Sequence, residues 1–95
     1  MDAAEARDDV RAKIKEIIAR VAGLQPARIG DQAVLTADLN LDSLSLLEIA
    51  VEVDLAFKLE LQDERYQGID SVPAMVALVE ERRRELVAQT EAVGG

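Results

Sequence analysis

Hydrophobic residues recur with the period of an α-helix in three stretches of this chain. In the first stretch they occupy one helix face at the i, i+4, i+7, i+8 and i+11 positions, which hold Val10, Ile14, Ile17, Ile18 and Val21. Gly23 follows directly, and glycine commonly ends a helix because it adopts the left-handed backbone without strain. The pattern therefore predicts an amphipathic helix that stops at Gly23.

Residues 24–42 show no helical period, and they contain Pro26, Gly30 and Asp31, which are typical of turns. We expect a long loop here. Loops of this length are uncommon unless they have a function or are attached to the core. Aliphatic residues are spaced through the segment, and we expect them to attach it: Leu24, Ile29, Leu35, Leu39 and Leu41.

The second helical stretch runs from Asp42-Ser43, two residue types that cap helices, to about Leu59. It has two hydrophobic faces. The first face holds Leu46, Ile49, Ala50, Val53 and Phe57. The opposite face holds Leu44, Leu47, Val51 and Leu55, and acidic residues border it at Glu48, Glu52 and Asp54. Such a helix is either enclosed in a core or presents one face to a partner. The bordering acids favour the docking interpretation.

After a connection at residues 63–68, in which we expect one helical turn, the last helix is predicted to begin at Asp70-Ser71. Its core face holds Val72, Met75, Val76 and Val79. Arg83 falls on the same face, so we expect the helix to leave the core there. The cluster Arg82-Arg83-Arg84 is interpreted as offsetting the helix C-terminal dipole and pairing with Glu80, Glu81 and Glu85.

Composition excludes most catalytic chemistry. The 95 residues suit one small domain, with no room for a large enzyme cleft. Without cysteine or histidine, the chain has no disulfide, no thiolate nucleophile, no imidazole acid–base group and no usual zinc ligands. We therefore expect a protein that is not an enzyme, and we interpret its clustered carboxylates as a solvated rim.

The charge balance narrows the choice of partners. Acidic residues outnumber basic ones by 19 to 11, which gives a formal net charge of −8. A chain this acidic is repelled by nucleic acids and anionic membranes, so we expect partners with basic docking surfaces. No apolar run reaches the length of a membrane span, and the N-terminus does not resemble a signal peptide. We expect a cytoplasmic monomer.

The segment Asp38-Leu39-Asn40-Leu41-Asp42-Ser43-Leu44 resembles the attachment motif of acyl carrier proteins, commonly Leu-Gly-x-Asp-Ser-Leu. The resemblance extends from about Val10 to Glu80 and includes the entry Ile69-Asp70-Ser71-Val72 to the last helix. It implies an all-α, four-helix bundle with a long first loop and a short third helix. We expect the carrier domain to span residues 1–88 and a flexible tail to span residues 89–95.

The resemblance also implies a function. Ser43 would carry a 4′-phosphopantetheine arm taken from coenzyme A, and the adjacent Asp42 would help a phosphopantetheinyl transferase and its magnesium to engage. Leu44, Leu47, Glu48 and Asp54 match positions at which carrier proteins commonly contact partner enzymes. On this basis we expect the chain to be a discrete carrier that delivers acyl thioesters to fatty-acid, polyketide or related biosynthetic enzymes.

Two alternatives and one departure stay open. Peptidyl carriers usually show a Gly-Gly-His/Asp-Ser pattern that this chain lacks, so the motif favours acyl over aminoacyl or peptidyl cargo. The other alternative is a helical adaptor that binds partners without a prosthetic group, with Ser43 as a simple helix cap.

Asn40 stands where the family usually has glycine; asparagine tolerates the left-handed backbone. Residues 38–42 also resemble the start of a calcium loop, but Ser43 and Ile49 occupy its required Gly and Glu positions, so we expect no metal site.

Overall fold

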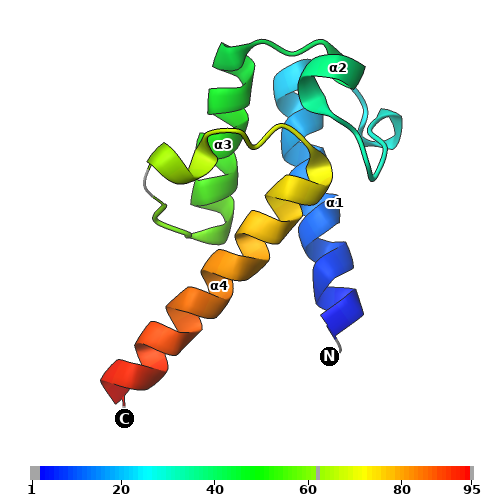
Figure 1. The fold of residues 1–95 in the computed structure, drawn as a ribbon. Helices are drawn as coiled ribbons and strands as arrows, with labels where there is room; N and C mark the ends of the chain where they lie inside the picture. Colours follow the sequence, from blue (N-terminus) through cyan, green and yellow to red (C-terminus); the bar gives the residue numbers. More distant parts are fainter. Residues whose placement is uncertain (1–2, 62, 95) are drawn as a thin grey trace.

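Four α-helices and two 3-10 turns make up the part of the chain that the computed structural model describes, residues 3–61 and 63–94, with side chains described for residues 8–61 and 65–89 (Figure 1). No strand forms within these ranges. In chain order the elements are α1 (Ala3–Ala22), η1 (Pro26–Arg28), α2 (Leu35–Leu39), α3 (Ser43–Phe57), η2 (Asp63–Tyr66) and α4 (Val72–Gly94).

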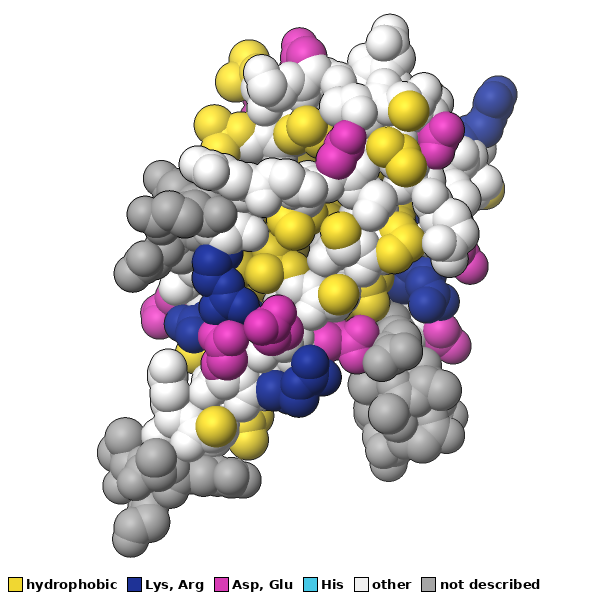
Figure 2. Space-filling model, viewed as in Figure 1, with side chains coloured by type: hydrophobic (Ala, Val, Ile, Leu, Met, Phe, Trp, Pro, Cys, Tyr) yellow, Lys and Arg dark blue, Asp and Glu magenta, His cyan; other side chains and the backbone are white. Residues whose placement is uncertain are grey.

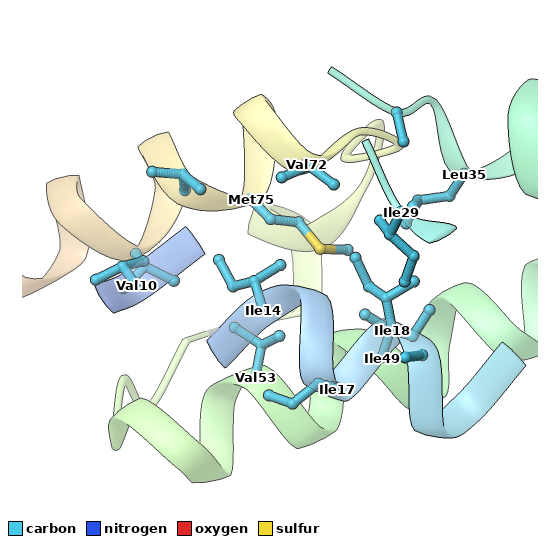
Figure 3. Close-up of a cluster of buried hydrophobic side chains, with 14 of the residues drawn as sticks. Val10, Ile14, Ile17, Ile18, Ile29, Leu35, Ile49, Val53, Val72 and Met75 are labelled. Atoms are coloured by element: carbon cyan, nitrogen blue, oxygen red, sulfur yellow. The ribbon is translucent and has the colours of Figure 1, made fainter. Parts of the chain in front are cut away.

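The core lies where the hydrophobic faces of α1, α3 and α4 meet. Helix α1 packs against both of the others, and its predicted face is buried except for Val21, which is partly buried against the core. Figure 3 shows side chains from these three helices and from the first loop converging on one cluster. Gly23 adopts a φ of 74° directly after α1, which confirms its predicted role as the helix stop. The predicted hydrophobic period therefore identifies the core correctly.

The sequence analysis expected a continuous loop between α1 and α3. The structure differs, because residues 35–39 form α2. Of the five aliphatic attachments, Ile29 and Leu35 are fully buried, and Leu39 and Leu41 pack partly buried against the core. Leu24 is an exception, with 40% of its surface exposed. Helix α2 was missed because five residues are too few to display a helical period.

Asp70 attaches α2 to the start of α4. Its carboxylate accepts hydrogen bonds from the Thr36 backbone amide at 3.0 Å and from the Thr36 hydroxyl at 2.6 Å. Its backbone carbonyl accepts from the amide of Leu35 at 2.8 Å. Ser71 caps α4 instead, because its Oγ accepts from the Ala74 amide at 3.2 Å. The predicted Asp70-Ser71 helix start is thus confirmed, with the two side chains serving different helices.

Helix α4 extends well beyond the core and continues to Gly94 (Figure 1). The interpretation that the arginine cluster offsets a C-terminal dipole is therefore wrong, since residues 82–84 lie in the middle of the helix. Arg82 pairs with Glu85 at 3.1 Å, as expected, and its Nε also donates to the Leu59 carbonyl at 2.7 Å. Arg83 lies 5.5 Å from the centre of the Phe57 ring.

The boundary of the carrier domain at residue 88 stays a prediction. The segment expected as a tail, residues 89–95, is helical as far as Gly94, and residue 95 lies outside the described residues. Figure 2 shows acidic and basic side chains grouped together on the lower half of the molecule, below an area where hydrophobic side chains reach the surface. Among the described helices, none is long and apolar enough to cross a membrane.

Candidate functional site

Ser43 is the first residue of α3, and its side chain is exposed. The residue before it, Asp42, is the N-cap: its backbone is extended, and its carboxylate accepts a hydrogen bond from the Ser45 amide at 2.8 Å. Within the described residues the Ser43 hydroxyl has no hydrogen-bond partner. The cap is therefore Asp42, which leaves the Ser43 hydroxyl free to react.

The surroundings of Ser43 keep this turn ordered and anionic. Hydrogen bonds from the Ser45 backbone amide and side chain hold the pKa of Asp42 below its ordinary value, so this carboxyl is ionised at neutral pH. Asn40 ends α2 with a φ of 56° and a ψ of 38°, as expected for a position that the family usually fills with glycine. Asparagine accepts this left-handed geometry with little strain.

A groove opens beside Ser43. Its volume is about 550 Å³, and it runs between α3 and the segment that leads into α4. Hydrophobic side chains from both walls line it, namely Leu46, Leu47, Ala50, Ile69 and Met75. Tyr66 and Asp70 add polar groups. An exposed hydroxyl thus lies at one edge of an open, largely apolar groove.

The second hydrophobic face of α3 points outward. Its four side chains are exposed by 64% at Leu44, 55% at Leu47, 48% at Val51 and 73% at Leu55. On the opposite face Ile49, Ala50 and Val53 are buried, and Leu46 and Phe57 pack partly buried against the core. Helix α3 is therefore not enclosed in a core, and it presents an apolar strip to the surface. We call Leu44, Leu47, Val51 and Leu55 the α3 strip.

The three acids expected to border this strip have different environments. Glu48 is exposed and forms no ion pair within the described residues. Glu52 is half-buried and pairs with Arg20 of α1 at 3.2 Å. Asp54 accepts hydrogen bonds from the amides of Glu60 at 2.9 Å and Leu61 at 3.0 Å, and from the Tyr66 hydroxyl.

Asp54 thus has structural contacts within the chain, and its expected part in partner docking stays a prediction. Partial burial raises the pKa of Asp54, but hydrogen bonds from the Tyr66 hydroxyl and from the amides of Leu61 and Glu60 outweigh it and lower the pKa below its ordinary value. The α3 spacing placed Asp54 beside the strip. The spacing along α3 carried no information on the following loop, whose amides donate hydrogen bonds to the carboxylate.

Two residues near the site escaped the sequence analysis. Arg20 contacts α3 from the last turn of α1, and Tyr66 lines the groove beside Ser43. Arg20 carried no signal because an isolated arginine on an exposed helix position is unremarkable in sequence. Tyr66 had one weak signal, since it is the only tyrosine in the chain. No group of three or more acidic side chains that could hold a metal occurs within the described residues.

Comparison with known proteins gives a consistent result. A family model described as a phosphopantetheine attachment site matches residues 12–79, a range that includes all of α3. The meromycolate extension acyl carrier protein of Mycobacterium tuberculosis is 33% identical over 79 residues, which cover 83% of this chain and 69% of that protein. The acyl carrier protein of Buchnera aphidicola is 32% identical over 71 residues, covering 75% and 91% of the two chains.

A solved structure extends the comparison to the fold. The acyl carrier protein from Enterococcus faecalis superposes with a TM-score of 0.65 at 30% sequence identity. The match covers 80% of this chain and 96% of that one. The sequence motif, the helical bundle and the exposed serine at the start of α3 therefore all indicate the same family as these comparisons.

Proposed function

Because the chain belongs to the acyl carrier protein family, we propose that it carries acyl groups as thioesters on an arm attached to Ser43. The prosthetic group of this family is 4′-phosphopantetheine, and the family's members are carriers and not catalysts. The observation that carries the proposal is the free, exposed Ser43 hydroxyl at the first position of a capped helix.

The residues around Ser43 fit a phosphodiester. The N-terminus of a helix favours an anion, and α3 is long enough to be rigid there. In the loading reaction Ser43 Oγ forms a bond to the phosphorus of coenzyme A that carries the pantetheine, the pyrophosphate bond breaks, and 3′,5′-ADP leaves. The hydroxyl proton passes to a base of the transferase. Asp42, ionised and exposed, is suited to meet the magnesium of that enzyme.

When bound, the arm supplies a terminal thiol that holds the cargo as a thioester. The groove beside Ser43 supports an apolar cargo, because its walls are hydrophobic and it begins at the attachment residue. The similar proteins are named as acyl carrier proteins. Both points favour a fatty-acyl or polyketide cargo over an aminoacyl one.

Loading tests the proposal directly. The purified chain is incubated with coenzyme A, magnesium and a broad-specificity phosphopantetheinyl transferase, and intact mass is measured before and after. We expect the mass to rise by one phosphopantetheinyl group. If several transferases leave the mass unchanged, the chain is an adaptor without a prosthetic group.

The α3 strip is the surface that we assign to partner enzymes, with Glu48 beside it. Exchange of Leu55, the most exposed member, for glutamine should raise the KM of an acyltransferase that loads the holo chain by about fivefold, because an apolar contact is lost. Val87→Gln is the matched control, since Val87 is also an exposed aliphatic side chain on a helix, 57% exposed, outside the strip. Equal KM values for the two variants would contradict the assignment.

A further inference from the structure

The surface next to the α3 strip is less acidic than the sequence suggests. Asp54 is turned into the loop that follows α3, and Glu52 is paired with Arg20. Glu48 is thus the one member of the three acids that is left without an internal partner among the described residues. A partner that docks here meets four apolar side chains, one free carboxylate and one arginine.

Arg20 lies at a groove between α1 and α3. The groove has a volume of about 590 Å³, and its lining residues are Arg20, Val21, Leu47, Glu48, Val51 and Glu52. Leu47 and Val51 also belong to the α3 strip, so the strip continues into this groove. The Arg20 side chain is 65% exposed, and only its Nη2 donates to Glu52, at 3.2 Å. The remaining N–H groups of the guanidinium are available to a partner.

We propose that the partner enzymes of this carrier fill the α1–α3 groove with an apolar side chain and face Arg20 with a hydrogen-bond acceptor, such as a carboxylate. This inference rests on the proposed carrier function and names the chemistry of the docking partner. Arg20 is then a specificity-determining residue: it cancels Glu52 and repels any lysine or arginine that a partner presents at this point. Specific interfaces commonly combine such repulsion with attraction.

The net charge of the chain does not conflict with this local assignment. A formal charge of −8 attracts basic proteins over long distances and raises the encounter rate. At contact, charges separated by more than a Debye length of about 8 Å are screened by physiological salt. The side chains within the groove therefore decide which of the attracted partners stays bound, and Arg20 is the cation among them.

Arg20→Gln tests the inference as a gain of function. The probe is a carrier-dependent ketosynthase chosen because lysines and arginines line its docking surface, assayed with the acyl-loaded holo chain. Arg28→Gln is the control, because Arg28 is an exposed arginine in η1, outside the groove, and both variants remove one positive charge from the chain. We expect the KM for the Arg20 variant to be about threefold below that for the Arg28 variant, the size of one exposed charge contact.

Each other result overturns the inference. Equal KM values would show that Arg20 lies outside the contact. A higher KM for Arg20→Gln would show that Arg20 favours binding of the basic surface and does not repel it. A second variant checks the pairing: Glu52→Gln frees Arg20 and should raise the KM relative to Glu16→Gln, an exposed acid of α1. Failure of the carrier function itself is distinguishable, because it appears earlier as a missing mass increase in the loading reaction.

Discussion

Ser43→Ala should take up no phosphopantetheine from coenzyme A and should keep the helical content and unfolding midpoint of the wild-type chain. The substitution removes a single exposed oxygen that has no hydrogen-bond partner within the described residues. Helix α3 keeps its start because Asp42, and not Ser43, accepts the amide of the first turn. Intact mass reports the loading, and circular dichroism during thermal unfolding reports the fold.

Two other serines, Ser45 and Ser71, serve as controls for that result. Ser45→Ala should still load, since it removes the hydrogen bond from the Ser45 side chain to Asp42 but keeps the one from the Ser45 backbone amide. Ser71→Ala should also load but lose about 1 kcal/mol of stability, because its Oγ caps α4. A mass increase in Ser43→Ala would place the arm elsewhere. A loss of helicity in that variant would make Ser43 a structural residue.

The features that the sequence predicts well are those that local geometry determines. A residue's direction on a helix follows from its position along the helix, so the buried and exposed faces of α3 are readable once the helix is assigned. Ile49 and Val53 are buried and Leu47 and Leu55 are exposed, as their spacing predicts. Asn40 belongs to the same class, because its left-handed backbone depends on one residue and its immediate neighbours.

The features that the sequence does not predict depend on contacts between distant segments. Asp70 binds Thr36 across 34 positions of the chain, and no local pattern announces that pairing. Glu52 was assigned to the docking surface from its place on α3, but its partner Arg20 lies on another helix. The helix over residues 89–94 was missed because the sequence analysis took the core face of this helix to end near Arg83 and expected a tail beyond residue 88.

The loop after α3 is held from two sides, and this explains why an exposed-looking acid is structural. Lys58 and Glu60 both adopt left-handed backbone, with φ values of 54° and 53°, which is unfavourable for residues other than glycine. Arg82, which lies on α4, donates a hydrogen bond from its Nε to the Leu59 carbonyl at 2.7 Å. Asp54 binds the loop amides from the other side. The carboxylate and the guanidinium therefore stabilise one strained turn together.

Asp54→Ala should consequently lower the free energy of unfolding by about 3 kcal/mol, roughly 1 kcal/mol for each of the three hydrogen bonds that its carboxylate accepts. Tyr66→Phe removes one of the three and should cost about a third as much. Urea unfolding followed by circular dichroism measures both. Asp9→Ala, which removes an exposed acid from α1, is the control and should change stability little.

The pH dependence of stability distinguishes the contribution of the ionised Asp54 carboxylate from other effects of removing this side chain. Because the pKa of Asp54 in the folded chain lies below its ordinary value of 3.8, the unfolded chain binds the proton more readily, and the stabilisation is complete above about pH 5. It is lost as the pH falls through the ordinary pKa and then through the folded one. The stability difference between wild type and Asp54→Ala should therefore shrink in acid. A difference that stays constant from neutral pH to pH values below about 3 would show that the ionised carboxylate is not the cause.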